Sequence, residues 1–146
     1  MGYAQVKVIT DLMGGSGVLG QDVRTQSDLL QIIAQGFPFV VLEHVAQTLG
    51  LSREEVAAVL VMPTRTLSRR KQAKHLHAQE SDRLFRFVRV AAHAGVALGS
   101  LEKAAQWLHR SNRALGGEIP LNLLNNDIGA VQVDDLLTRI EQGIMS

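Results

Sequence analysis

Apolar side chains recur every three or four residues along most of this chain, and a glycine or proline follows nearly every such run. This spacing places them on one face of an α-helix, whereas a half-buried strand would need strict alternation. The best patterned run extends from Ser81 to Leu98 and ends at Gly99, with Leu84 and Val88 on its apolar stripe. The pattern therefore predicts an all-α fold.

The composition is that of a globular protein, with 46% hydrophobic and 20% charged residues among 146. Cysteine is absent, which excludes disulfides, thiolate nucleophiles and cysteine-ligated metal sites and suits a reducing compartment. The longest apolar stretch, residues 37–42, is much shorter than the ~20 residues of a membrane helix, and the N-terminus does not resemble a secretion signal. We therefore expect a cytoplasmic protein without a membrane partner.

Turn-forming residues divide the sequence into three parts. Residues 1–36 are expected to form an N-terminal segment with one helix, preceded by a loosely held, glycine-rich stretch. Residues 37–80 contain a helix that follows Pro38, a short helix opened by the capping box of Ser52 and Glu55, and a third helix from Thr64. Residues 81–146 contain the long helix and several shorter helices separated by glycine or asparagine turns.

Positive charge is concentrated between residues 64 and 74, which include no acidic residue although the net charge of the chain is only +1. A capped helix, a tight turn and a polar, basic second helix have the layout of a helix-turn-helix, whose second helix enters the major groove of DNA. A basic run is more often a solvated helix face, but the capped turn and the lack of acids favour DNA binding. The candidate DNA-binding residues are Thr64, Arg65, Thr66, Ser68, Arg69, Arg70 and Lys74.

The helix-turn-helix could be read in two registers. Ala46 and Gly50, in front of residues 52–60, also resemble the first helix and turn of such a motif. Only the register that pairs residues 52–60 with residues 64–73 places the basic side chains on the reading helix, and we prefer it for that reason. In this register Val61 stands where the turn usually has glycine.

A second group of arginines lies on the long helix at a spacing of three residues, and consists of Arg83, Arg86 and Arg89. These side chains could extend the basic surface. They could equally form ion pairs with nearby acids along the helix, namely Glu80, Asp82 and Glu102.

No constellation of catalytic or metal-binding residues is evident. His75 and His77 are the one close histidine pair, and only Glu80 lies near them in the sequence. The glycine-rich residues 14–20 lack the lysine and the strand–helix context of a phosphate-binding loop. We therefore expect no catalytic residue, no metal and no cofactor, because an enzyme would need an acid, a base and a nucleophile that are not found here.

Three stretches near the C-terminus carry a family resemblance: residues 104–108 (AAQWL), residues 111–121 (SNRALGGEIPL) and residues 129–143. With residues 65–70 and 81–84 upstream, they resemble the Xre/MbcA/ParS antitoxin family. The sequence departs from the family at Ser111, where relatives usually have proline, and at Val61 in the turn.

The resemblance implies an Xre-like helix-turn-helix domain followed by a small helical toxin-binding domain, in an antitoxin of a type II toxin–antitoxin system. Its partner would be a RES-domain toxin that depletes NAD, and the antitoxin, as a homodimer, would also repress its own operator DNA. The alternative is a stand-alone helix-turn-helix regulator or a plasmid-partition protein. The toxin-binding residues implied are Leu136, Arg139, Ile140, Gln142, Gly143, Ile144 and Ser146, of which Leu136 and Ile140 are also candidates for the core.

Overall fold

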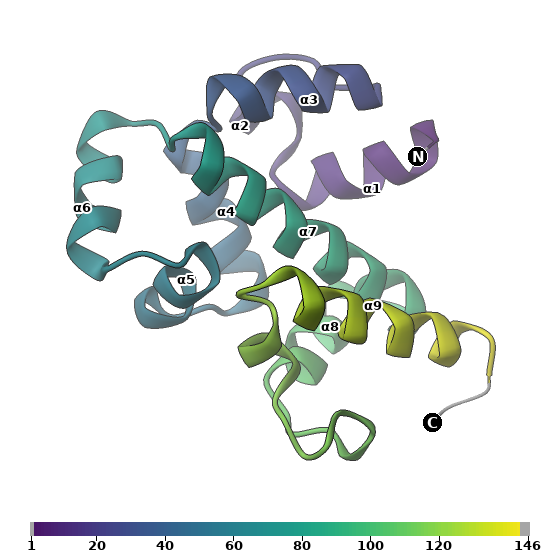
Figure 1. The fold of residues 1–146 in the computed structure, drawn as a ribbon. Helices are drawn as coiled ribbons and strands as arrows, with labels where there is room; N and C mark the ends of the chain where they lie inside the picture. The colour runs from purple at the N-terminus through teal and green to yellow at the C-terminus, as the bar shows by residue number, and fades with distance from the viewer. Residues whose placement is uncertain (1, 144–146) are drawn as a thin grey trace.

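The computed structural model describes residues 2–143, which form helices and contain no β-strand beyond an isolated bridge between Pro38 and His75 (Figure 1). The predicted all-α class is confirmed. The helices in chain order are α1 (Tyr3–Leu12), α2 (Gly15–Leu19), α3 (Gln26–Gln35), α4 (Phe39–Leu49), α5 (Arg53–Leu60), α6 (Thr64–Ala73), α7 (Ala78–Leu98), α8 (Leu101–Leu108), the 3₁₀ turns η1 (Arg113–Leu115) and η2 (Pro120–Leu123), and α9 (Asp127–Glu141).

Helix α7 is the centre of the fold, because it packs against α1, α3, α5, α8 and α9. Phe87, Val88 and Ala91 on this helix are almost completely buried, and one hydrophobic core joins residues from all parts of the chain. Figure 1 shows α7 running between the N-terminal helices and α9. The boundary expected between residues 80 and 81 falls in the first turn of α7, so this helix contributes to both regions beside it.

No single helix between residues 2 and 143 has both the length and the hydropathy of a membrane span. Helices α7 and α8 meet these criteria only when they are taken together, and they are bent by 114° where they join.

The N-terminal segment contains three helices instead of the one expected, and the prediction that its first part is loosely held is wrong. Val6, Leu12 and Leu19 on α1 and α2 are buried in the core, where these helices pack against α4 and α7. Gly14 has a φ of +105°, and a Cβ there would lie 2.6 Å from side-chain atoms of Val18. The sequence did not reveal α2 because its five residues are too few for a periodic pattern.

The turn between α5 and α6 contains a strained residue. Val61 has φ 55° and ψ 54°, a left-handed conformation that is unfavourable for a β-branched residue by roughly 1–2 kcal/mol, and its side chain is 53% exposed. We expect Val61→Gly to raise the free energy of unfolding by about 1 kcal/mol in urea denaturation, because little buried surface is lost. Ala58→Gly introduces glycine at an exposed position inside α5 and is the control, because it should have the opposite effect and lower the free energy of unfolding by about 1 kcal/mol. Equal losses in both variants would show that Val61 is unstrained.

Candidate nucleic-acid interface and C-terminal surface

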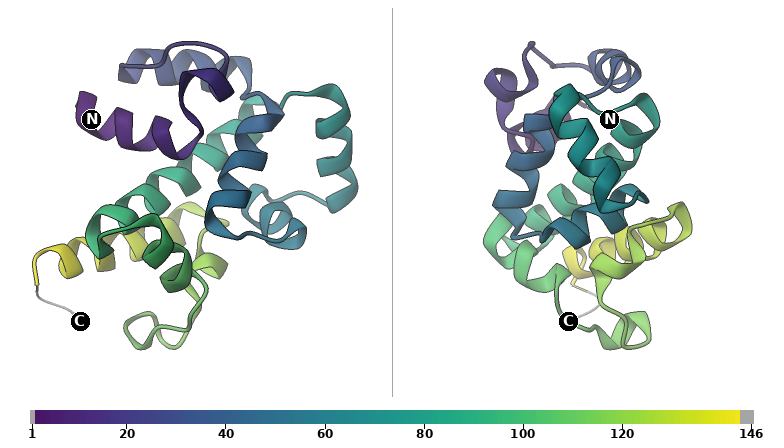
Figure 2. Two further views of the ribbon diagram at one scale, coloured as in Figure 1. Left: turned by 180° about the vertical axis from the view of Figure 1, so that it is seen from behind. Right: turned by 90° about the vertical axis from the view of Figure 1, so that its left-hand side faces the viewer.

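Helices α5 and α6 form a two-helix unit at one end of the molecule. The Ser52 hydroxyl accepts a hydrogen bond from the backbone N–H of Glu55 (3.1 Å), and the Glu55 carboxylate accepts one from the N–H of Ser52 (2.8 Å). Leu67 is the buried anchor of α6, which packs against α5. Figures 1 and 2 show α6 at the edge of the fold, beside the N-terminal end of α7, whereas the C-terminal end of α9 lies toward the other end of α7. The arrangement leaves α6 accessible, as a DNA-reading helix must be.

Most of the candidate DNA-binding residues lie on the accessible side of this unit. Thr64, Arg65, Arg69 and Lys74 are exposed, and Thr66 and Ser68 are half-buried. The guanidinium of Arg69 donates a hydrogen bond to the hydroxyl of Thr66 (3.2 Å). Within residues 2–143, Arg65 and Arg69 form no ion pair with an acidic side chain. Their charge is therefore available to a polyanion.

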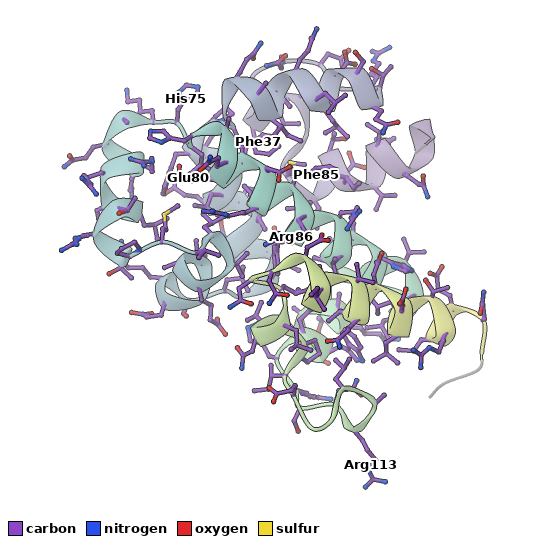
Figure 3. The ribbon with its side chains drawn as sticks, in the orientation of Figure 1. Phe37, His75, Glu80, Phe85, Arg86 and Arg113 are labelled. Carbon is purple, nitrogen blue, oxygen red and sulfur yellow. The ribbon has the colours of Figure 1, made fainter. Side chains whose placement is uncertain are left out.

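Arg70 is placed differently from the other candidates. Its Nε donates to both carboxylate oxygens of Glu80, at 2.9 and 3.0 Å, and its side chain is only 17% exposed. Glu80 Oε1 also accepts a hydrogen bond from the backbone N–H of His77 at 2.7 Å. Figure 3 shows Glu80 at the beginning of α7, facing α6. This contact holds the end of α6 against α7.

Arg53 was not recognised as part of this surface from the sequence. Its guanidinium donates hydrogen bonds to the backbone carbonyl of Thr64 (2.9 Å) and to the hydroxyl of Ser68, and thereby joins the start of α5 to α6. The available signal was a basic residue directly after the N-cap Ser52, in the helix that precedes the basic one.

The candidates on α9 and beyond it separate into two groups. Leu136 is 3% exposed and belongs to the core, and Ile140 is half-buried. Arg139, Gln142 and Gly143 are exposed at the C-terminal end of α9. Ile144 and Ser146 lie outside the described residues.

A histidine clamp joins α9 to α7. His93 Nδ1 lies 2.6 Å from a carboxylate oxygen of Asp134, and its Nε2 contacts the carboxylate of Glu141. Burial alone would lower the pKa of His93, but hydrogen bonds and negative charge from Asp134 and Glu141 outweigh it and raise the pKa above its usual value. When it is protonated, the imidazole can donate from both nitrogens and bridge these two carboxylates, which lie about two turns apart on α9.

The clamp gives a stability that depends on pH. Because the pKa of His93 is higher in the folded state, its contribution is fully present below the unfolded histidine pKa of about 6.5 and is lost as pH rises through the folded pKa. We expect the difference in free energy of unfolding between the wild type and His93→Gln to be largest near pH 6 and to shrink by pH 9. Urea denaturation at both pH values measures it, and a difference that grows with pH would contradict the clamp.

His75 and His77, the close histidine pair of the sequence, are both exposed, and His77 Nδ1 lies 3.3 Å from a guanidinium nitrogen of Arg70. In the part of the chain that the structure describes, no group of three or more histidine, aspartate or glutamate residues could hold a metal ion.

Comparison with protein families gives two adjacent matches that together cover most of the chain. A family described as "Antitoxin Xre-like helix-turn-helix domain" matches residues 28–89, from α3 to the middle of α7. A second, "Antitoxin Xre/MbcA/ParS C-terminal toxin-binding domain", matches residues 93–143. Helices α1 and α2 precede both matched regions.

The chain is also similar to curated proteins named Antitoxin Xre. It is 35% identical to one from Photorhabdus laumondii over 117 residues, which are 79% of each chain. It is 33% identical to one from Yersinia enterocolitica over 121 residues, which are 81% of each chain. A third relative, from Pseudomonas putida, is 36% identical over 84 residues, which are 57% of this chain and 53% of that protein.

Proposed function

The chain belongs to the Xre/MbcA/ParS antitoxin family, and we propose that it neutralises a NAD-depleting RES-domain toxin by direct binding and represses its own operon as a homodimer. Both activities follow from binding, with no reaction catalysed by this chain. The observation that carries the proposal is the separation of two accessible surfaces, the basic helix α6 and the end of α9, at different ends of one core (Figure 1). Such a protein can hold DNA and toxin at the same time.

For DNA binding, the proposal rests on the exposed, uncompensated charge of Arg65 and Arg69 on α6. Arginine forms bidentate contacts with guanine in the major groove and ion pairs with phosphate. Arg70 would act indirectly, because its pair with Glu80 fixes the orientation of α6. A homodimer would place two copies of α6 on the two halves of a palindromic operator.

We expect the double substitution Arg65→Ala and Arg69→Ala to weaken binding to the promoter of the operon at least tenfold. If both side chains contact phosphate, the salt dependence of the binding constant should fall by roughly 0.9 per lost contact, or about 1.8 in all. Fluorescence anisotropy with a labelled promoter fragment at several salt concentrations measures both quantities.

The matched control for that experiment is Arg110→Ala with Arg113→Ala. These two arginines are exposed, and their substitution removes the same charge as the first double substitution. Figure 3 shows Arg113 pointing away from the body of the molecule. Their loss should leave affinity and salt dependence within twofold of the wild type. Equal effects of the two double substitutions would mean that net charge, and not α6, determines DNA binding.

For toxin binding, the proposal rests on the exposed end of α9, where Arg139 and Gln142 point away from the core formed by Leu136 and Leu137. A helix end held rigidly against α7 loses little conformational entropy when a partner binds it. The charged guanidinium of Arg139 could pair with a carboxylate on the toxin. Neutralisation would then be steric, because the antitoxin covers the active-site cleft.

Co-expression with the product of the adjacent gene tests this function. We expect the wild-type chain to restore growth and NAD level and to co-purify with that product. Arg139→Ala with Gln142→Ala should weaken co-purification at least tenfold, whereas Gln31→Ala with Gln47→Ala, at exposed positions on α3 and α4, should not. A neighbouring product that is harmless and never binds would leave a stand-alone DNA-binding regulator as the function.

A further inference from the structure

A groove of about 500 Å³ runs between α1 and α9, with α7 as its floor. Ile9 on α1 and Ala92 on α7 are buried beneath it, and Val8 and Val96 lie along it with 40% and 58% of their surface exposed. Figure 1 shows α1 and α9 on either side of the C-terminal half of α7. Apolar side chains in a concave surface of this size are typical of a site that receives a ligand or a partner segment.

Arg89 is the basic residue of this groove, and its charge has no counterpart within residues 2–143. Its Nε is buried without a hydrogen-bond partner, and its guanidinium forms no ion pair. The two acids that line the groove, Asp134 and Glu141, are both engaged by His93. The Arg89 side chain is half-buried, and its buried Nε–H, which lacks a hydrogen-bond partner among the described residues, carries a desolvation cost that a carboxylate from outside the chain would offset.

We propose that this groove receives a segment of the toxin in which an apolar side chain is followed or preceded by an acidic one. The apolar side chain would pack against Val8, Ala92 and Val96, and the carboxylate would form a bidentate pair with Arg89. The inference rests on the proposed function, and it extends the toxin contact from the end of α9 across α7 to α1, a helix that precedes both family matches.

The chemistry of the groove favours a protein segment over nucleic acid. Arg89 and His93 are the basic residues among the described residues that line the groove, which is little positive charge for a phosphate backbone, and α6 lies at the far end of α7 from this groove (Figures 1 and 2). The groove is also continuous with the matched toxin-binding region, because His93, Val96 and every α9 residue that lines it lie within residues 93–143.

A second copy of this chain is a poorer occupant. In a two-fold contact centred on the groove, two concave grooves would face each other and two copies of Arg89 would approach without a free acid. A protruding, acidic segment from a different protein fills the space and supplies the missing charge.

The clamp of His93 keeps the groove open before any partner arrives. By contacting Asp134 and Glu141, His93 holds α9 against α7, which forms the floor of the groove. A preformed groove lowers the entropic cost of binding.

The test measures the affinity of purified full-length variants for the product of the adjacent gene. Val96→Glu places an acidic side chain where the apolar and acidic side chains of the toxin should bind. Arg89→Gln removes the positive charge that should pair with the toxin carboxylate. We expect each to weaken binding at least tenfold. Val40→Glu, on α4 with 50% exposure, is the matched control and should stay within twofold of the wild type. Melting temperature and promoter binding, measured in parallel, show that each variant is folded.

Four outcomes are distinguishable. Selective losses in Val96→Glu and Arg89→Gln, with normal promoter binding, support the groove. Wild-type binding that neither substitution weakens overturns the groove and leaves the proposed function intact. A neighbouring product that does not bind even the wild type overturns both. A dimer that Val96→Glu converts to monomer in sedimentation, with unchanged toxin affinity, shows that a second copy occupies the groove and overturns the inference.

Discussion

Gly129→Ala should be strongly destabilising, with a loss of about 3 kcal/mol or more in the free energy of unfolding. A Cβ at this position would lie 1.8 Å from the carbonyl oxygen of Leu123 and 2.8 Å from its carbonyl carbon. These are backbone atoms of η2, so no side-chain rotation relieves the overlap. Either the first turn of α9 or η2 must move, and both are packed against the core.

The shift would also break the cap of α9, because the Asn126 side chain accepts a hydrogen bond from the N–H of Gly129 at 2.8 Å. Urea and thermal denaturation measure the effect, and about 3 kcal/mol corresponds to a fall in melting temperature of roughly 6–12 °C for a chain of this size. Toxin binding should be lost together with the native structure.

Gly17→Ala is the matched control for that substitution. Gly17 lies inside α2, and a Cβ there would meet no heavy atom within 4 Å. The exchange should stabilise the chain by up to about 1 kcal/mol, because alanine favours the helix. If Gly129→Ala melted with the wild type, α9 would not approach η2 as closely as the structure shows.

Glu80→Ala should also be strongly destabilising, with a loss of about 3 kcal/mol in the free energy of unfolding. The substitution leaves the guanidinium of Arg70 without its anion in a largely buried position, and it frees the backbone N–H of His77. Because this contact holds α6 against α7, operator affinity should fall together with stability. Denaturation and promoter binding of the same preparation measure both effects.

An exposed ion pair provides the control for Glu80. Glu43 lies 3.5 Å from Lys71, with the two side chains 48% and 64% exposed. Since solvent screens such pairs, Glu43→Ala should cost less than about 1 kcal/mol. Similar losses in the two variants would mean that Arg70 and Glu80 are as solvated as the surface pair.

The carboxylate of Glu80 also makes the stability of the protein depend on pH in the acidic range. Burial alone would raise the pKa of Glu80, but hydrogen bonds from Arg70 and from the His77 N–H, with the positive charge of Arg70, hold it below its usual value. A depressed folded-state pKa means that the contribution is complete above the unfolded glutamate pKa of about 4.3 and is lost as pH falls through the folded pKa. The stability difference between wild type and Glu80→Gln should therefore narrow below about pH 4.

Much of the fold could be read from local sequence rules. The apolar spacing of residues 39–49 and 81–98 predicted α4 and α7, and the pair Ser52 and Glu55 predicted the start of α5. These signals are strong because each depends only on residues one helical turn apart. Helices α1 and α2 were missed because the glycine-rich residues 14–17 follow α1 directly and form part of α2, whose five residues are too few for a periodic pattern.

The candidate sites show the same division. The basic character of α6 was visible in the sequence, but charge alone did not separate Arg65 and Arg69, which face solvent, from Arg70, which is paired with Glu80. The carboxylate of Glu80 was considered as a partner of the arginines on its own helix. Its actual partner is Arg70 at the end of α6, and the backbone N–H of His77 donates a further hydrogen bond to the same carboxylate.

The helical class, the helix-turn-helix and the antitoxin family could thus be inferred from the amino-acid sequence, since they depend on periodicity, capping and short motifs within one helix or turn. Which side chains are free became visible only in the folded chain. The tertiary structure placed Arg70 in an ion pair, buried Leu136, joined His93 to α9 and gave the Nε of Arg89 no hydrogen-bond partner within residues 2–143. Burial and charge compensation depend on segments many residues apart, which are brought together by the packing of α1 and α9 against α7 and by the contact of Arg70 on α6 with Glu80 on α7.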